Sequence, residues 1–300
     1  MFDFRDIHLS DRDEANRCLT VSDKQGCEYS FANNLAWRRL DDTRICFHNG
    51  FYICVGQLDT EPCVFFPAGA KLDEEGKSRL KALLDELESF FKSRRQRFTL
   101  CSVYENELEW LKEVYGDRIT YTYDRDSSDY IYKTTDLIEF KGKKFHGKRN
   151  HIKRFMETDW SFEQLTEDKI DECVFFTAEF YNRVGENYGS AAVEQFAIHT
   201  FLMNMKALGI QGGILRQNGG IVGISLGEPL NSDTYVVHIE KARNDLNGAY
   251  PTLCREFAKA YAADYEFINR EEDMGREGLR TSKLSYHPRY LLNKYSVFID

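Results

Sequence analysis

Residues 212–263 read GGILRQNGGIVGISLGEPLNSDTYVVHIEKARNDLNGAYPTLCREFAKAYAA. This one continuous stretch contains the signals of a hairpin, a third strand and a helix. Its first two apolar runs are separated by Asn218-Gly219, the strongest short-range hairpin signal, because both central positions of a type I′ turn need positive φ. The third strand, residues 234–242, is rich in β-branched side chains. Apolar residues then recur at helical spacing after Asn247, the predicted N-cap, with Pro251 in the first turn. The stretch therefore predicts a sheet whose third strand leads through a polar turn into a helix.

The polar turn before this helix is the first candidate binding site. The amides that open a helix have no intrahelical partners, and the positive end of the helix attracts anions. We expect a phosphate of a ligand to be held here by Arg243, Asn247, Gly248 and Ala249. The alternative, common among helix N-termini, is that the turn binds only water and a capping side chain.

The first half of the chain repeats the same order of elements. RICFHNGFYICVGQ turns at Asn49-Gly50, PCVFFP is a third strand, a helix carries apolar residues from Leu80 to Phe91, and FTLCSVY is the next strand. We infer an α+β fold with two copies of one unit, each a mixed, mostly antiparallel sheet flanked by helices. The expected domains are residues 1–135 and 136–300. Acidic residues crowd the helix start in the first copy and would repel a phosphate, so the second copy is expected to carry the site.

Composition limits the classes of function. The 300 residues are 42% hydrophobic and 14% aromatic, enough for well-packed cores, and the formal charge of −9 argues against bulk DNA binding. The N-terminal residues are charged rather than signal-like, and no window approaches the ~18 apolar residues of a membrane span. We expect a soluble, cytoplasmic protein. We interpret the eight cysteines as buried thiols and expect no metal site, because neither cysteines nor histidines show metal-ligand spacing.

A basic block lies between the two copies, in DLIEFKGKKFHGKRNHIKRFME, residues 136–157. In a helical arrangement, Lys144 and Lys148 fall near one face, and Arg149 is adjacent. We expect these three to contact phosphates of a nucleotide, a tRNA or a lipid headgroup. The alternative is an interdomain helix with a solvated charged face.

The C-terminal stretch FINREEDMGREGLRTSKLSYHPRY, residues 267–290, is rich in candidate ligands. Asp273 follows a strand end and can act as a general base, and Tyr286 can donate a proton to a leaving group. Arg280 and Lys283 can neutralise an oxyanion or orient an acceptor. The alternative is a charged surface loop.

Three segments together resemble a known bacterial family: GKKFHGKRNHIKRF, the strand VHIEKA with its NGAY helix start, and NREEDMGREGLRTSKLSYHPRY. They are similar to the phosphatidylglycerol lysyltransferase C-terminal domain family, and the likeness covers nearly all of the chain. The resemblance implies two tandem acyltransferase folds of the GCN5-related N-acetyltransferase (GNAT) type. It also implies that the turn at residues 243–248 corresponds to the pyrophosphate-binding turn of coenzyme A enzymes, although Gly248 is its only glycine. Membrane-bound members of the family transfer an aminoacyl group from charged tRNA to a lipid.

These observations favour an acyltransferase that moves an acyl or aminoacyl group directly to an amine or hydroxyl. The donor is expected to be aminoacyl-tRNA or acyl-coenzyme A, used as a co-substrate rather than a tightly bound cofactor, and the acceptor is a small molecule, a peptide or a lipid. Glu240, on the strand leading into the site, is the predicted base, with Asp273 as substitute. The alternative is a non-catalytic module on the same fold that binds tRNA, a nucleotide or a phosphorylated metabolite.

Overall fold

The computed structural model describes residues 2–58, 61–184 and 191–300. The chain forms two compact units. Unit 1 consists of Met1–Asp129, Glu272–Arg276 and Leu291–Asp300, and unit 2 of Tyr130–Glu271 and Glu277–Tyr290.

Unit 1 has a mostly antiparallel sheet with the strand order β1-β2-β3-β4-β5-β12-β6. Asn49 and Gly50 join β2 to β3, and both have positive φ (49° and 77°), as a type I′ turn requires. β4 and β5 run parallel, with Val64 opposite Leu100. The strands of this sheet are β1 (Arg5–Asp6), β2 (Arg44–His48), β3 (Phe51–Leu58), β4 (Glu61–Phe65), β5 (Phe98–Val103), β6 (Ile119–Lys133) and β12 (Tyr290–Ile299).

Helices of unit 1 bury their apolar faces against this sheet. Asp73 caps α3 by accepting a hydrogen bond from the Gly76 amide at 2.8 Å. The apolar side chains of α3 and α4 join residues of β3, β4, β5 and β12 in one core. The helices are α1 (Arg12–Ser22), α2 (Phe31–Trp37), α3 (Glu74–Ser93) and α4 (Glu105–Tyr115), with 3-10 turns at Leu9–Asp11, Cys27–Tyr29 and Gly116–Arg118.

Unit 2 repeats this arrangement with the strand order β6-β11-β10-β9-β8-β7, β6 entering through its last residues. Asn218 and Gly219 join β8 to β9 with φ of 50° and 78°. β10 is antiparallel to β9 and parallel to β11. The strands that lie wholly in unit 2 are β7 (Trp160–Gln164), β8 (Gln211–Gln217), β9 (Gly220–Pro229), β10 (Thr234–Ala242) and β11 (Phe267–Asn269).

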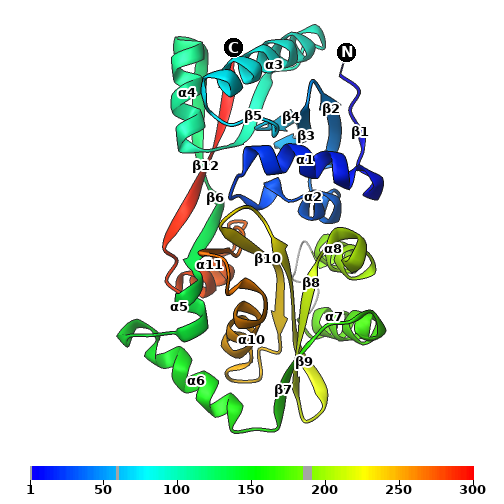
Figure 1. Cartoon of the computed structure of the whole chain (residues 1–300), viewed down its shortest axis with the longest axis vertical. Helices are drawn as coiled ribbons and strands as arrows, with labels where there is room; N and C mark the ends of the chain where they lie inside the picture. The colour runs from blue at the N-terminus through cyan, green and yellow to red at the C-terminus, as the bar shows by residue number, and fades with distance from the viewer. Residues whose placement is uncertain (1, 59–60, 185–190) are drawn as a thin grey trace. The chain divides into compact units, whose positions relative to one another are not determined.

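Helices cover both faces of the unit 2 sheet, with α10 on one face and α7 and α8 on the other (Figure 1). Phe155 of α6 and Leu253 of α10 pack together against Leu215 and Val222 of the hairpin. This packing holds α6 beside the start of α10. The helices are α5 (Thr134–Glu139), α6 (His146–Met156), α7 (Ile170–Val184), α8 (Ala191–Met203), α9 (Met205–Leu208), α10 (Ala249–Phe257), continued as a π-helix over Ala258–Ala262, and α11 (Glu277–Leu284), with 3-10 turns at Lys143–Phe145 and Glu167–Lys169.

The predicted α+β fold is confirmed, because each unit contains a hairpin, a third strand, a helix and a parallel fourth strand in that order. The boundary differs from the expected one at residue 135. β12 pairs with β5, so the last ten residues belong to unit 1 rather than to the second half. The interpretation of all cysteines as thiols is wrong for Cys63 and Cys101, which form a disulfide between β4 and β5.

Candidate active site

β10 and β11 are paired over three residues and then separate. Thr234–Val236 pair in parallel with Phe267–Asn269, where β11 ends, whereas β10 continues to Ala242. A register shift between Val237 and Ile239 marks a bulge in β10, which bends the strand and redirects its side chains. Side chains beyond this point can therefore meet residues that follow β11.

Glu240 and Arg270 meet there in an ion pair. Glu240 Oε1 lies 2.7 Å from Arg270 Nη2, and the two side chains are 9% and 10% exposed. The Arg270 backbone is fixed on both sides, because its amide donates to the Tyr130 carbonyl at 3.1 Å and its carbonyl accepts from Lys283 Nζ at 2.6 Å. The pair is thus held rigidly in a nearly water-free environment.

Two further side chains of the predicted site lie beside this pair. Arg270 stands over the ring of Tyr286, with Cζ 4.4 Å from the ring centroid. Lys148 of α6 places Nζ 3.4 Å from the same centroid and donates to Ser285 Oγ at 2.9 Å. Glu240, Lys148, Lys283 and Tyr286 are therefore brought together although they come from three separate parts of the sequence.

Burial sets the protonation behaviour of this group. Burial raises the pKa of Glu240, against the opposing pull of Arg270, Lys148 and Lys283. Burial and then the charge of Arg270 lower the pKa of Lys148 to about 8. Burial raises the pKa of Tyr286 well above its usual value, so the phenol keeps its proton at neutral pH. A carboxyl with a raised pKa next to a protonated phenol is the arrangement that general acid–base chemistry uses.

His238 occupies the bulge of β10 and is completely buried between two carboxylates. Its Nδ1 lies 2.8 Å from Glu271 Oε1 and its Nε2 lies 3.2 Å from Glu228 Oε1, and its ring stacks on Phe201. Burial alone would lower the pKa of His238, but the hydrogen bonds to both carboxylates raise it to about 9. The charged imidazole ties β9, β10 and the segment after β11 together at neutral pH.

The turn before α10 is fastened to α6. Gly248, rather than the expected Asn247, is the N-cap, and its φ is 92°. A Cβ at this position would lie 2.3 Å from the His151 carbonyl oxygen, so only glycine fits. Asn247 Oδ1 contacts the His151 ring, and the Ala249 amide donates to the Leu246 carbonyl at 3.2 Å.

The remaining residue of the turn, Arg243, pairs with Asp245, Nε to Oδ1 at 3.0 Å. Phosphate binding by this turn stays a prediction.

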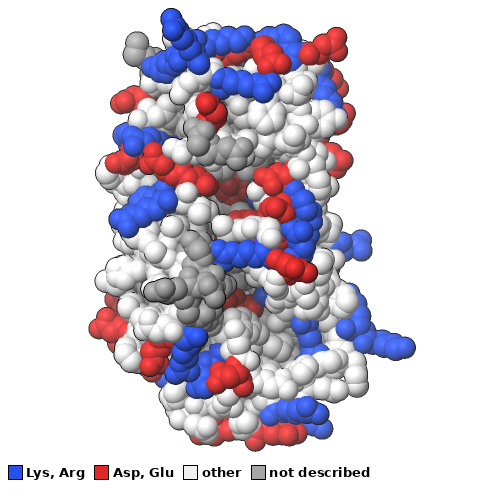
Figure 2. Space-filling model, turned by 180° about the vertical axis from the view of Figure 1, so that it is seen from behind, with Lys and Arg blue, Asp and Glu red and all other residues white. Residues whose placement is uncertain are grey.

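Two of the basic-block residues chosen from the sequence have partners in unit 2. Lys144 pairs with Asp136 at 3.0 Å, and Arg149 donates to the carbonyls of Phe140 and, at 2.7 Å, Gly142. Within the described ranges, the cations of this block without an ion-pair or hydrogen-bond partner for the side chain include Lys143, Lys153 and Arg154. Figure 2 shows basic and acidic side chains interspersed over the face that it presents.

A hollow of about 400 Å³ lies beside α6 and is lined by residues of α5, α6 and α10. Phe140, Ile152 and Met156 give it an apolar lining, and its charged lining residues are Arg149, Lys153, Arg255, Glu139 and Glu157. Its volume is within the range of small-ligand sites.

The other two predicted site residues are placed differently. Asp273 belongs to unit 1, where it is fully buried and accepts from Arg125 Nη1 at 3.0 Å and from the Gly275 amide at 2.9 Å. These contacts indicate a structural role in the segment Glu272–Arg276. Arg280 lies on α11 of unit 2 and is partly exposed.

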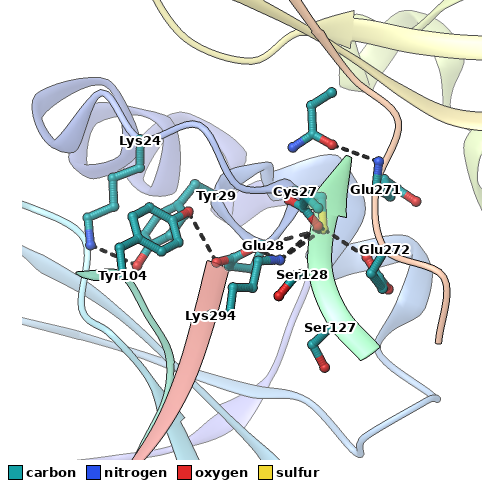
Figure 3. Close-up of polar contacts among 12 residues, drawn as sticks. Lys24, Cys27, Glu28, Tyr29, Tyr104, Ser127, Ser128, Glu271, Glu272 and Lys294 are labelled. Carbon is teal, nitrogen blue, oxygen red and sulfur yellow. Dashed lines mark hydrogen bonds and ion pairs between the residues drawn. The ribbon is translucent and has the colours of Figure 1, made fainter. Parts of the chain in front are cut away.

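Unit 1 contains a buried polar cluster of its own, centred on Lys294 (Figure 3). Its Nζ lies 2.7 Å from Glu28 Oε2 and 2.9 Å from Asp129 Oδ1, and Cys27 Sγ lies 3.3 Å from Glu272 Oε2. Ligand atoms of Cys27, Asp129 and Glu272 lie within 4.8 Å of one another, the spacing of a metal site. The Lys294 ammonium forms an ion pair with Asp129, so one of these three possible metal ligands already has a positively charged partner.

The family model for the C-terminal part of phosphatidylglycerol lysyltransferase matches residues 19–298. The chain belongs to this family. A conserved protein of unknown function from Bacteroides thetaiotaomicron is 38% identical over the full length of both chains, with a TM-score of 0.91. The C-terminal domain of a putative lysylphosphatidylglycerol synthetase from Agrobacterium fabrum is 15% identical, with a TM-score of 0.67, covering 98% of this chain and 92% of that domain.

Other proteins share the fold at low sequence identity or match only part of this chain. FemX is 9% identical with a TM-score of 0.66, covering 99% of this chain and 97% of FemX. The fold of this family member is the expected pair of GNAT-like units. An uncharacterised protein of Mycoplasmoides gallisepticum is 25% identical over 199 residues, 64% of this chain, and the match spans 61% of that protein's length. Every helix in the described part of the chain is too short or too polar to cross a membrane.

Sequence reasoning missed Arg270 and His238. Arg270 directly follows the strand FIN. Its positive charge at a strand end was a signal in the sequence that Arg270 could be a partner of the predicted base Glu240. His238 is two residues before Glu240, but its burial depends on the bulge and on Phe201 of α8, which local patterns do not show.

Proposed function

We propose that unit 2 is an acyltransferase site that moves an aminoacyl or acyl group from a phosphate-containing donor directly to an amine or hydroxyl. The single observation that carries the proposal is the buried Glu240–Arg270 pair at the point where β10 and β11 separate. Membership of a family described as a lysyltransferase supports aminoacyl transfer in particular.

In the proposed step, the acceptor nitrogen forms a bond to the acyl carbon of the donor ester. The ester C–O bond breaks, the proton of the attacking amine passes to Glu240, and the leaving oxygen takes a proton from Tyr286. Arg270 holds the Glu240 carboxylate in place, and Lys148 beside Tyr286 favours the negative charge that develops during the transfer. No covalent enzyme intermediate is involved.

The donor's phosphates are proposed to contact the outer side of α6. Lys153 and Arg154 of α6 and Lys143 of the preceding 3-10 turn are exposed, and Lys153 also lines the hollow with Arg149 and Arg255. Electrostatic contacts of this kind are sequence-independent and suit the backbone of a tRNA. Aminoacyl-tRNA is therefore the preferred donor, and acyl-coenzyme A is the alternative.

Thermal stability tests the donor, because a ligand that binds the native state raises the melting temperature by mass action. We expect charged tRNA to raise it, with uncharged tRNA giving a smaller rise. A rise with acetyl-coenzyme A and not with tRNA would redirect the proposal to small-molecule acyl transfer. A rise in melting temperature with a donor, without transfer to any acceptor, would favour a non-catalytic binding module.

A further inference from the structure

Arg270 uses only part of its hydrogen-bonding capacity. Nη2 bonds to Glu240 at 2.7 Å, but the buried Nη1 has no hydrogen-bond partner among the residues that the structure describes. The side chain is nine-tenths buried, so water does not compensate freely. An unpaired donor in such a place costs free energy unless a ligand completes it.

Basic side chains from three segments act on the carboxylate that Arg270 holds. Arg270, Lys148 and Lys283 all act on Glu240, the one carboxylate among these four interacting groups. Burial, and after it the charge of Arg270, lowers the pKa of Lys148 to about 8, so Lys148 lies close enough to Arg270 to respond to a change of charge there. An anion on Nη1 satisfies this donor and offsets the charge of Arg270.

The planar guanidinium fixes where this anion lies. Nη1 and Nη2 are the two ends of one rigid fork, so a group on Nη1 lies next to the carboxylate on Nη2. The rings of Tyr286 and Tyr132, centred 4.4 and 5.6 Å from Arg270 Cζ, flank the guanidinium and exclude water, which strengthens a charged contact.

We propose that Arg270 Nη1 binds the carboxylate of the acceptor and that the acceptor is an α-amino acid, whose amine then lies against Glu240. This inference rests on the proposed function, because it names the substrate class of the same site. An α-amino acid fits since its amine and carboxylate are attached to one carbon and can reach the two neighbouring positions together. A simple amine without an acidic group leaves Nη1 unpaired, and inorganic phosphate offers no amine to Glu240.

Isothermal titration calorimetry with four probes tests the substrate class directly: glycine, glycinamide, ethylamine and inorganic phosphate. We expect glycine to bind, and glycinamide and ethylamine to bind at least about tenfold more weakly, because each lacks the carboxylate that a charged hydrogen bond of about 1.5–3 kcal/mol would hold. Equal binding of glycine and glycinamide, binding of phosphate alone, or no binding of glycine would each overturn the proposal.

Arg270→Lys is the variant that isolates Nη1. A lysine keeps one positive donor for Glu240 but has no second nitrogen in the fork. We expect its glycine Kd to rise at least about tenfold. Arg216→Lys is the matched control, since Arg216 forms ion pairs with Glu163 and Glu172 away from the site, and its glycine Kd should not change.

A second readout does not depend on the variant's folding. Lysine Cε NMR of the wild-type protein should show the pKa of Lys148 rising when glycine binds, whereas an unchanged Lys148 titration in the presence of bound glycine would contradict the proposed position.

Failure of the inference and failure of the proposed function give different results. If glycine binds but no acyl group is transferred, the carboxylate subsite is supported and the proposed reaction is refuted. If glycinamide and glycine accept the acyl group equally, the reaction is supported and the carboxylate subsite is refuted.

Discussion

Glu240 and Arg270 are 30 positions apart in the sequence, yet Glu240 Oε1 lies 2.7 Å from Arg270 Nη2 in a buried ion pair. The contact exists because β10 and β11 pair for only three residues and then separate. Breaking one member of a buried pair leaves the other charge uncompensated, so both residues are needed for a stable site.

Gly248→Ala should destabilise unit 2 by about 1–3 kcal/mol, because the backbone is left-handed there and the new Cβ meets the His151 carbonyl. Urea denaturation measures the change. Gly147→Ala in the neighbouring helix is the control, since a Cβ there meets nothing within 4 Å and should stabilise by up to about 1 kcal/mol. An unchanged midpoint for Gly248→Ala would show that α6 does not pack on this turn.

His238 predicts a loss of stability with rising pH. The folded pKa of about 9 is higher than the ordinary value of 6.5, so the contribution is complete below about pH 6.5 and is lost as the pH rises through about 9. The full loss is about 3 kcal/mol, at about 1.4 kcal/mol for each unit of the pKa difference. Lys148, whose folded pKa is lowered to about 8, acts in the opposite direction only above that pH.

Denaturation of the wild type and of His238→Gln between pH 6 and 8 separates the two groups. The wild type should lose stability over this window, and the variant should be less stable at pH 6 and nearly independent of pH. Parallel curves for the two proteins would mean that His238 is not held in its charged form.

Replacing Lys143, Lys153 and Arg154 together by glutamine should weaken tRNA binding and make it less dependent on salt. Three lost phosphate contacts should reduce the slope of log K against log salt by about two to three. Fluorescence anisotropy over a salt series measures this slope. The control replaces Lys77, Lys81 and Lys112 of unit 1, which should leave the slope unchanged; an equal effect of both triple variants would refute a specific role for α6.

Local patterns predicted the elements well. Asn218-Gly219 and Asn49-Gly50 made type I′ turns, and the third strand led into a helix in both units. The same order of elements in the two halves was therefore sufficient to predict the α+β fold.

Long-range relationships were not predictable in this way. β12 pairs with β5 although the two strands are nearly 200 positions apart in the sequence, and no local pattern predicts such a pairing. The Arg270 contact needs the separation of two strands, and the role of Asn247 depends on His151 of a different helix. Asp273 illustrates the same limit, since its proximity in sequence to the candidate site did not indicate its pairing with Arg125.

Glu240→Gln in a transfer assay tests the central claim most directly. Labelled aminoacyl-tRNA and an amino acid acceptor are incubated with the wild type, with Glu240→Gln, and with Glu179→Gln, which removes an exposed carboxylate of α7. We predict that transfer falls by about 10²–10⁴-fold in Glu240→Gln, with donor binding retained and Glu179→Gln unaffected. Transfer by Glu240→Gln at the wild-type rate would contradict the account, because the carboxylate buried against Arg270 would then not be the base.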